Sequence, residues 1–381
     1  MRCHAVPRLL SLTALLSISA IAASPLSAAA STIDSAVQAV MRTHGIPGMV
    51  VAITQGKDAQ FHAYGFASKQ TRQPVDPDTL FELGSVSKTL TATLAALAEV
   101  RGTLALDDSP SRHLPALAGS ALDGVTLRHL ATHTAGGFPL QLPEQVREPK
   151  QLTAYFRDWT PTYPAGTQRT YANPSIGLLG LTTAKSLGQP YASALSGMLS
   201  ELGMTHTYLD VPASAADRYA QGYNRDDQPV RLNPAPLANE AYGLKSSARD
   251  MLRFVQAQLG TVNVTDELRQ AMATTRTGYY QVGPMTQGLV WEQYGYPTAL
   301  QPLLEGNSSR MALESQPAKA IEPPLAPQAD AWINKTGSTN GFGAYLAFIP
   351  ARQLGIVILA NRFYPNEARV RLAYEILETL D

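Results

Sequence analysis

The chain has 381 residues, of which 45% are hydrophobic and 16% charged, and its formal net charge is +0 at pH 7. This length and composition allow a sizeable core, arranged as two modest domains or one composite domain, and exclude a disordered chain. The balanced charge, without a long basic or acidic run, argues against nucleic acid and anionic membrane surfaces as partners.

Residues 1–30 are predicted to be a cleaved secretory signal peptide. Arg2 and Arg8 precede a short apolar run, Leu9 to Ala23, and sites of small residues suited to cleavage follow. The run is too short for a stable membrane span, so an uncleaved anchor is the less favoured alternative. Cleavage would also remove Cys3, the only cysteine. We therefore expect a periplasmic protein, monomeric and without membrane contact once the signal is removed.

Both ends of the remaining chain show strand patterns. A helix is predicted over 32–44, and the stretch GMVVAITQGKDAQFHAYGFAS after it contains two β-rich runs around the turn Gly56-Lys57-Asp58. Near the C-terminus, DAWINKTGS, GAYLAFIP and LGIVILANRF are three further strand candidates. A last helix is predicted over 367–380, where apolar residues recur at helical spacing.

The middle of the chain differs from its ends. From about residue 85 to 258, helical patterns alternate with loops rich in proline and glycine, and the proline-rich span 301–327 is predicted to be an extended surface segment. The order of strands, helices and strands predicts an α/β (α+β) fold, with one antiparallel sheet flanked by the terminal helices and a mostly helical domain inserted. We assign 31–80 and 301–381 to the α/β domain and 81–300 to the helical domain, with the active site in the cleft between them.

The segment FELGSVSKTL contains the motif S-x-x-K at Ser85 and Lys88. Residues three apart share a helix face, so the lysine can reach the serine hydroxyl, which needs a neighbouring base to become a nucleophile. The apolar helix that follows would desolvate Lys88 and make it a better base. Alone, the motif is weak evidence, because a capped helix with a solvated lysine has the same pattern.

Two further motifs follow in chain order. Tyr171-Ala172-Asn173 offers a tyrosine that could serve as a base near lysines and an amide that could bind a substrate amide. Lys335-Thr336-Gly337 lies on a strand candidate that enters a glycine-rich turn, where the N–H of Ser338 could pair with that of Ser85 as an oxyanion hole. Without a catalytic role, the first motif would be an ordinary packed loop, and the second would be an exposed edge strand with a protective lysine. The order S-x-x-K, Y-x-N, K-T-G is related to the motif set of β-lactamases and penicillin-binding proteins.

Other candidate sites are weaker. His129 and His133 have the spacing of a zinc pair, but the glutamate of H-E-x-x-H is absent and no third ligand suggests itself, so we expect a structural role and no metal. The sequence lacks G-x-S-x-G, which argues against an α/β-hydrolase, and lacks a G-x-G-x-x-G after a strand, which argues against a dinucleotide enzyme. No cofactor is expected.

With these motifs in place, the chain resembles the class C serine β-lactamases over nearly its whole length after the signal. The resemblance rests on FELGSVSKT, LATHTAGGFPLQLP, YANPSIGLLG, EAYGLKSS, KTGSTNGFGAYLAFIP and LGIVILAN. It implies that Ser85 is the acylated nucleophile, that Lys88 and Tyr171 share the general-base work in a division that stays open, and that Lys335 neutralises charge. It also implies that substrate is bound by Gln141, Asn173, Tyr242, Thr336, Gly337, Ser338, Asn366 and Arg369.

Some positions depart from the family pattern. Ser338 stands where alanine is frequent, although only its backbone is expected to be needed. The remaining departures surround the K-T-G motif and the expected site for the substrate carboxylate: Asn334, Asn340, Phe363 and Glu367.

The expected function is that of a secreted serine β-lactamase that hydrolyses cephalosporins and penicillins through an acyl-enzyme. A penicillin-binding D,D-peptidase or an esterase on the same fold is the first alternative. A binding protein that has kept the fold without catalysis is the second.

Overall fold

The computed structural model describes residues 1–4 and 25–380, with side chains from residue 32 onward in the second range. Most of the predicted signal peptide therefore lies outside the described residues. No helix among the residues that were described is long and apolar enough to cross a membrane.

The sheet has nine antiparallel strands in the order β13-β9-β10-β11-β14-β15-β16-β1-β2. Strands β1 and β2 form the hairpin predicted around Gly56-Lys57-Asp58, and β14, β15 and β16 are the three predicted C-terminal strands. These predictions are confirmed. The strand bounds are β1 Gly48–Gln55, β2 Asp58–Gly65, β9 Gly278–Val282, β10 Met285–Gln287, β11 Glu292–Gly295, β13 Lys319–Leu325, β14 Ala331–Ser338, β15 Gly343–Ile349 and β16 Leu354–Ala360.

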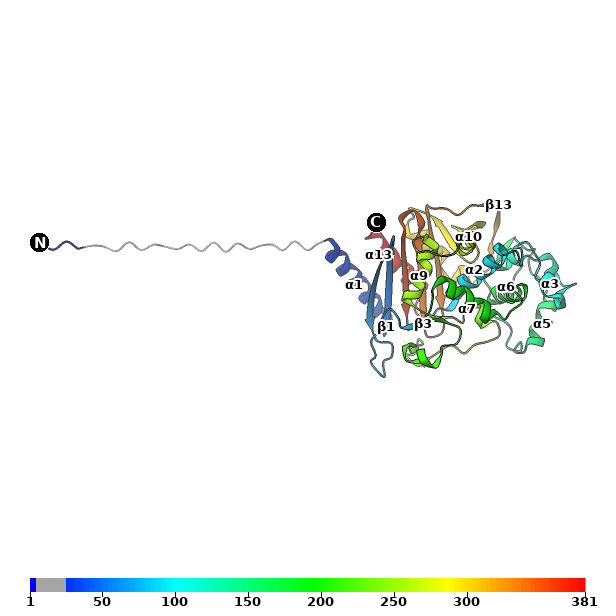
Figure 1. Cartoon of the computed structure of the whole chain (residues 1–381), viewed down its shortest axis with the longest axis horizontal. Helices are drawn as coiled ribbons and strands as arrows, with labels where there is room; N and C mark the ends of the chain where they lie inside the picture. Colours follow the sequence, from blue (N-terminus) through cyan, green and yellow to red (C-terminus); the bar gives the residue numbers. More distant parts are fainter. Residues whose placement is uncertain (5–24, 381) are drawn as a thin grey trace.

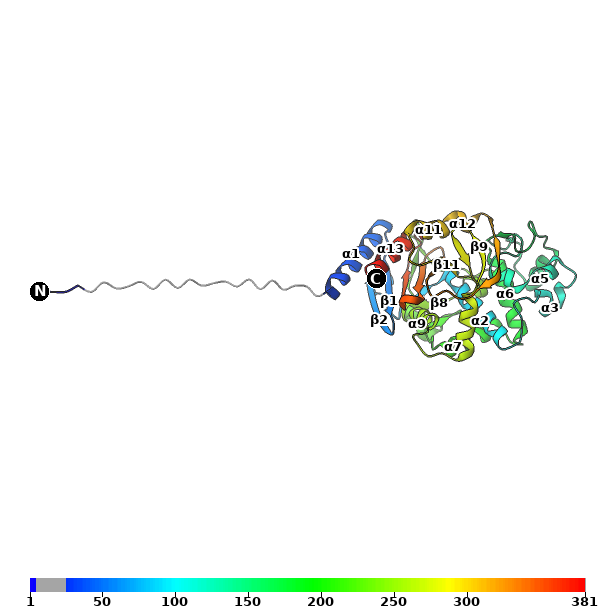
Figure 2. The same ribbon diagram turned by 90° about the horizontal axis from the view of Figure 1, so that it is seen from above.

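Helices cover both faces of this sheet. The terminal helices α1 (Pro25–His44) and α13 (Asn366–Glu378) pack on each other, and α13 packs on β15 and β16. Helix α9 (Ala248–Leu259) covers β1, β15 and β16 from the other side, as Figures 1 and 2 show. Because both faces are covered, every residue of β15 and β16 is buried.

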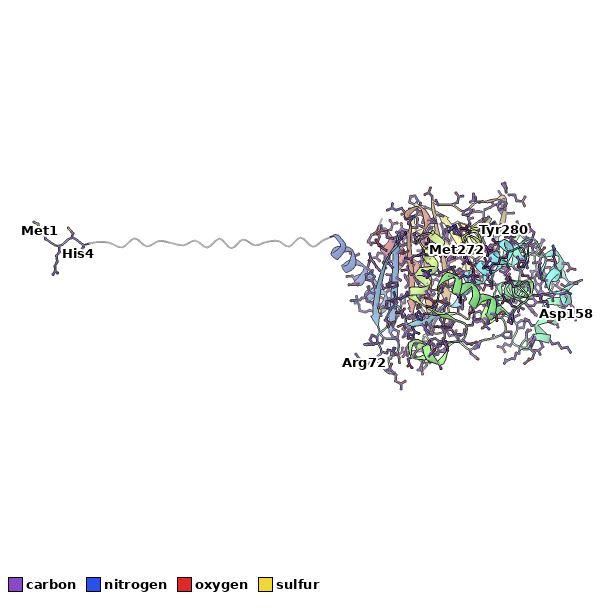
Figure 3. All side chains as sticks on the ribbon, in the orientation of Figure 1. Met1, His4, Arg72, Asp158, Met272 and Tyr280 are labelled. Atoms are coloured by element: carbon purple, nitrogen blue, oxygen red, sulfur yellow. The ribbon has the colours of Figure 1, made fainter. Side chains whose placement is uncertain are left out.

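The helical part lies beyond α9, on the side away from α1 (Figure 1). Its central helices are α2 (Ser87–Val100) and α6 (Asn173–Ser186), which pack on each other. In Figure 3, Asp158 at the end of α5 marks the tip of this part farthest from α1. The other helices are α3 Pro110–His113, α4 Leu127–Ala131, α5 Pro149–Asp158, α7 Tyr191–Leu202, α8 Ala238–Ala241, α10 Asp266–Thr275, α11 Leu300–Gly306 and α12 Ser309–Leu313.

Short strands outside the main sheet tie loops together. Their bounds are β3 Leu80–Glu82, β4 Gln168–Arg169, β5 Thr207–Tyr208, β6 Gly222–Tyr223, β7 Pro229–Val230, β8 Lys245–Ser247 and β12 Gln316–Pro317. Strand β8 lies between β3 and β5, and β12 pairs with β4, which ends two residues before Tyr171 of the Y-x-N motif.

The prediction of an extended surface segment over 301–327 is wrong for its first half. Helices α11 and α12 occupy 300–306 and 309–313, and only β13 is an exposed extended strand. Pro302 lies in the first turn of α11, where its missing N–H costs no helical hydrogen bond, and Pro323 and Pro324 lie on an edge strand. The sheet also takes β9–β11 from 278–295, inside the span that was expected to be helical.

Candidate active site

Ser85 lies in a single 3₁₀ turn, Gly84–Val86, that leads directly into α2. Within residues 80–98, Ser85 is the one residue that is not fully buried. The adjacent Ser87 is buried and its hydroxyl accepts a hydrogen bond from the N–H of Leu244 at 3.2 Å. The local fold therefore presents one of the two serines of the motif to the surface and uses the other for packing.

Lys88 is completely buried one turn below Ser85, as the S-x-x-K spacing predicts. Its Nζ donates to Ser85 Oγ at 3.0 Å, to Asn173 Oδ1 at 2.6 Å and to the carbonyl of Ala241 at 2.9 Å. These three bonds use all the donors of an ammonium group. Burial lowers the pKa of Lys88 to about 8, with the charge of Lys335 acting in the same direction. The lysine can therefore lose its proton near neutral pH.

Tyr171 lies among cations. The Nζ atoms of Lys88 and Lys335 each lie 5.2 Å from the centroid of its ring, and Arg169 Cζ lies 5.5 Å away. Burial alone would raise the pKa of Tyr171, but the charges of Lys335 and Lys88 and a hydrogen bond with Ser85 outweigh it and lower the pKa to about 8. Both Lys88 and Tyr171 thus titrate in the range that a general base needs.

Asn173 is the first residue of α6 and is buried beside Lys88. Its side-chain oxygen accepts the bond from Lys88, and its backbone N–H donates to the carbonyl of Leu140 at 3.0 Å. The acceptor half of this amide is therefore occupied, and its NH₂ group is the part left for a substrate carbonyl. Tyr171 and Asn173 enter the site together because they lie two residues apart where α6 begins.

Strand β14 meets the turn before α2 at two glycines. A Cβ atom added to Gly337 would lie 2.1 Å from the carbonyl oxygen of Leu83, and one added to Gly84 (φ +53°) would lie 2.5 Å from the backbone nitrogen of Ser338. Only glycine permits this approach of the two backbones. It brings the chain segments that carry the N–H groups of Ser85 and Ser338 side by side, as an oxyanion hole requires.

A cavity of about 150 Å³ lies at this junction. Its walls include the end of the strand that carries the K-T-G motif, the turn that carries Ser85 and the start of α13. The predicted residues that line it are Ser85, Tyr171, Lys335, Thr336, Gly337, Ser338 and Asn366. A second hollow of about 250 Å³ shares Tyr171 as a wall and extends over Leu140, Leu313 and Glu314.

Besides Lys88 and Asn173, three predicted residues do not line the cavity. Gln141 is exposed, but the residue before it, Leu140, holds the backbone of Asn173. Tyr242 is half-buried directly after Ala241, whose carbonyl binds Lys88. Arg369 is fully buried behind Ser338. The first two therefore flank the site, whereas Arg369 lies behind its wall.

The sequence reasoning missed a buried ion pair in the wall of the cavity. Arg169 Nη2 donates to Glu292 Oε1 at 3.0 Å, and that oxygen lies 3.9 Å from Lys335 Nζ. Arg169 also donates to Gln287 at 2.7 Å and to the carbonyl of Met311 at 2.8 Å, so it is fully held. The only sign of Arg169 in the sequence was its position two residues before Tyr171. Its partner Glu292 lies 123 residues further along the chain.

The two histidines of the H-x-x-x-H pair have structural roles, as expected. His129 Nδ1 accepts from the N–H of Thr126 in the capping box of α4, and His133 Nδ1 accepts from the N–H of Ala172. The centroid of the His133 ring lies 4.5 Å from that of the Tyr171 ring. Burial, with the nearby cations, holds the pKa of His133 well below its usual range. Among the residues described, no group of three His, Cys, Asp or Glu side chains could hold a metal ion.

The positions that depart from the family pattern are accommodated. Asn334 is buried, accepts from the hydroxyl of Tyr345 at 3.1 Å and donates to Glu292 at 3.3 Å. Asn340 is exposed in the turn between β14 and β15. Phe363 packs under the guanidinium of Arg225 at 4.7 Å, and Glu367 pairs with Arg371 on the surface of α13.

Fold and site together define a serine hydrolase, with a buried lysine beside Ser85 and a tyrosine of lowered pKa. Comparison with known proteins agrees, since the family model for β-lactamase matches residues 33–381. The chain belongs to the β-lactamase family.

Similar proteins of known structure include class C β-lactamases. A β-lactamase of Lysobacter lactamgenus is 51% identical over 354 residues, which are 93% of this chain and 92% of the relative. A solved class C β-lactamase in complex with cefoxitin is 48% identical with a TM-score of 0.90, over 93% of this chain and 99% of that one. A β-lactamase/D-alanine carboxypeptidase from Pseudomonas syringae is 53% identical with a TM-score of 0.92, over the same shares of the two chains. The predicted family and fold are confirmed.

Proposed function

We propose that this enzyme is a secreted β-lactamase that hydrolyses cephalosporins and penicillins through an acyl-enzyme on Ser85. The observation that carries the proposal is the presentation of Ser85. It is the one accessible residue of a buried stretch, it lines the cavity, and Lys88 Nζ lies 3.0 Å from its hydroxyl.

In acylation, Ser85 Oγ attacks the lactam carbonyl and its proton passes to the pair formed by Lys88 and Tyr171. The carbonyl oxygen becomes negative and would accept from the N–H groups of Ser85 and Ser338. Collapse of this intermediate breaks the C–N bond, and the ring nitrogen takes up the proton that the pair has received. Both residues have a pKa of about 8, so they titrate as a pair that shares this proton.

In deacylation, Tyr171 as phenolate would take a proton from water, whose oxygen then attacks the ester carbon. The bond between that carbon and Ser85 Oγ breaks, and Oγ takes up the proton that Tyr171 received. The charges of Lys335 and Lys88 support this role because they favour the phenolate. Gln141, the NH₂ group of Asn173 and Tyr242 would hold the acylamide side of the substrate. Thr336 and Asn366, both on the cavity wall, would lie near its carboxylate.

The same site could instead cleave a peptide ending in D-alanine. One similar solved structure is described as a β-lactamase/D-alanine carboxypeptidase, which keeps a D,D-peptidase as the second candidate. The two functions differ in deacylation by water after reaction with a β-lactam, which is fast only in a β-lactamase.

The test is steady-state turnover of a chromogenic cephalosporin and of an acyl-D-alanyl-D-alanine peptide by the purified protein. We expect many turnovers of the cephalosporin, none after Ser85→Ala, and retained turnover after Ser87→Ala, because the buried hydroxyl of Ser87 accepts from the N–H of Leu244 and does not line the cavity. A stoichiometric burst without turnover, together with peptide cleavage, would favour the peptidase.

Secretion is a proposal from the sequence of residues 1–30. Expression of the full chain in a Gram-negative host, followed by fractionation and N-terminal sequencing, tests it. We expect the protein in the periplasm with a new N-terminus among the small residues around positions 20–30.

A further inference from the structure

Tyr171 is held through the backbone on both of its sides, and both hydrogen bonds lead to His133. The carbonyl of His133 accepts from the N–H of Thr170 at 2.8 Å, and its side-chain Nδ1 accepts from the N–H of Ala172 at 3.3 Å. The imidazole is fully buried, and its centroid lies 4.5 Å from that of the Tyr171 ring. One residue therefore fixes the N–H groups that directly precede and follow Tyr171.

The backbone of His133 has an unusual conformation. Its φ of +60° lies in the left-handed region, where glycine is the usual residue. The same loop has glycine at its next two positions of positive φ, Gly136 and Gly137. Strain of this kind is found mostly at functional sites. A histidine where glycine would cost less therefore indicates that its side chain is used.

His133 makes these contacts as a neutral imidazole. Its Nδ1 needs a lone pair to accept from the N–H of Ala172, so the proton of the ring is on Nε2. Burial, followed by the charges of Arg169 and the two lysines of the site, lowers the pKa of His133 and keeps the ring uncharged. With Nδ1 occupied and Nε2 protonated, this ring is suited to hold Tyr171 in place and not to act as a base.

The position of Tyr171 decides how strongly its charged neighbours act on it. Lys335 and Lys88 favour the phenolate form and Glu292 opposes it, while Arg169 Cζ lies 5.5 Å from the centroid of the ring. The Nζ atoms of the two lysines each lie 5.2 Å from that centroid. Because the interaction between charges weakens with distance, a shift of Tyr171 away from the lysines would favour its protonated form.

We propose that His133 is a positioning residue for Tyr171, whose imidazole holds residues 170–172 where Tyr171 can work with Lys88 and Lys335. This inference rests on the proposed function, which gives Tyr171 the role of a base. The sequence singled out His133 only by its spacing from His129. The structure connects it to the catalytic tyrosine instead.

The experiment separates the Nδ1 acceptor of His133 from its ring. His133→Phe keeps an aromatic ring and removes the acceptor, and it loses no bond at Nε2, which has no partner among the described residues. His133→Asn places an oxygen at the position of Nδ1, and asparagine tolerates the left-handed backbone. The pH titration of tyrosinate absorbance is recorded for both variants, and its difference from Tyr171→Phe identifies Tyr171.

In the wild type we expect one tyrosine to ionise near pH 8, and this step should be absent from Tyr171→Phe. His133→Phe should move the step to higher pH. It should also lower kcat/KM for a chromogenic cephalosporin about tenfold, mainly through kcat, because a buried N–H loses its acceptor and the base is displaced. His133→Asn, the conservative variant, should restore the wild-type titration and most of the activity.

His129→Phe is the matched control. The Nδ1 atom of His129 also accepts from a backbone N–H, that of Thr126, but this bond lies at the start of α4 and not beside Tyr171. The control should lower the Tm and leave the tyrosinate titration unchanged. His133→Leu, which matches asparagine in shape and lacks the acceptor, repeats the test if melting shows that His133→Phe does not fold.

A wild-type titration in the variants that lack the acceptor would overturn the proposal. A shift of the same size in His133→Asn would overturn it too, because the acceptor would then not be the cause. Absence of cephalosporin turnover by the wild type would instead overturn the proposed function, since the titration reports on Tyr171 without turnover.

Discussion

At the scale of single residues, burial and nearby positive charges set the pKa values of Lys88 and Tyr171. Lys88 and Tyr171 both have a pKa lowered to about 8, and they lie close enough to titrate as a pair. The reactive form of this pair has lost one proton. We therefore expect kcat/KM for a chromogenic cephalosporin to rise with pH and to level off above an apparent pKa near 8. A profile that is flat between pH 6 and 9 would contradict this assignment.

Lys335 is the strongest cationic influence on Tyr171. Burial opposes ionisation of Tyr171, and the charge of Lys335 is the largest effect that favours it. Replacing it in Lys335→Met should raise the pKa of Tyr171 and move the rising limb of the pH profile to higher pH. The matched control is Lys319→Met on the exposed strand β13, which should leave the limb in place. Equal pH profiles for the two variants would mean that Lys335 does not lower the pKa of Tyr171.

Glu240 is a buried acid that the reaction does not use. Burial raises its pKa from 4.5 to about 7. The folded state therefore keeps a proton that the unfolded state loses, and this group lowers stability as the pH rises from about 4.5 to 7, by on the order of 3 kcal/mol. We expect the Tm of the wild type to fall relative to Glu240→Gln over this range and to run parallel above it. A constant difference across the range would show that Glu240 is not buried as a neutral acid.

At the scale of elements, α6 uses glycines to approach α8. A Cβ atom on Gly180 would lie 2.6 Å from Cγ of Glu240, whereas Gly197 in α7 has no neighbour within 4 Å. Gly180→Ala should lower the free energy of unfolding by about 1–3 kcal/mol through overpacking. Gly197→Ala should raise it by about 0.5–1 kcal/mol, because alanine suits a helix better. Denaturant unfolding of both variants tests these two predictions. A higher free energy of unfolding for Gly180→Ala would mean that α6 and α8 are more loosely packed than the structure shows.

Elements with strong local patterns were predictable from the sequence. The hairpin β1–β2, the strands β14–β16 and the last helix were expected within a few residues of where they lie, because each carries a turn signal or an apolar period. Strands β9–β11 were missed because they are short, and their place in the sheet depends on pairing with β14 and β13, which are distant in the chain. Helix α11 was missed because its proline was taken as a breaker.

At the scale of the whole molecule, the site exists because the sheet and the helical part meet at two glycines. The order of the three motifs predicted that Ser85, Tyr171 and Lys335 would come together, and they do. It could not predict the pair Arg169–Glu292, since nothing local in the sequence relates a buried arginine to an acid on another strand.

The glycine contact gives a prediction for the molecule as a whole. In Gly337→Ala the new Cβ would lie 2.1 Å from the carbonyl oxygen of Leu83, so β14 must move away from the turn that carries Ser85. We expect turnover to fall by at least about a hundredfold, because one oxyanion donor and the position of Lys335 are both lost. The measurement is kcat/KM at a temperature where circular dichroism shows the variant folded, and near-normal activity there would mean that the junction tolerates the shift.

The central claim is that Ser85 is the nucleophile, and intact-mass spectrometry after incubation with a slowly deacylated β-lactam tests it most directly. The account predicts that the protein gains the mass of one β-lactam, that peptide mapping places it on Ser85 rather than Ser87, and that Ser85→Ala gains nothing. An adduct that persists in Ser85→Ala, or turnover by that variant at the wild-type rate, would contradict it.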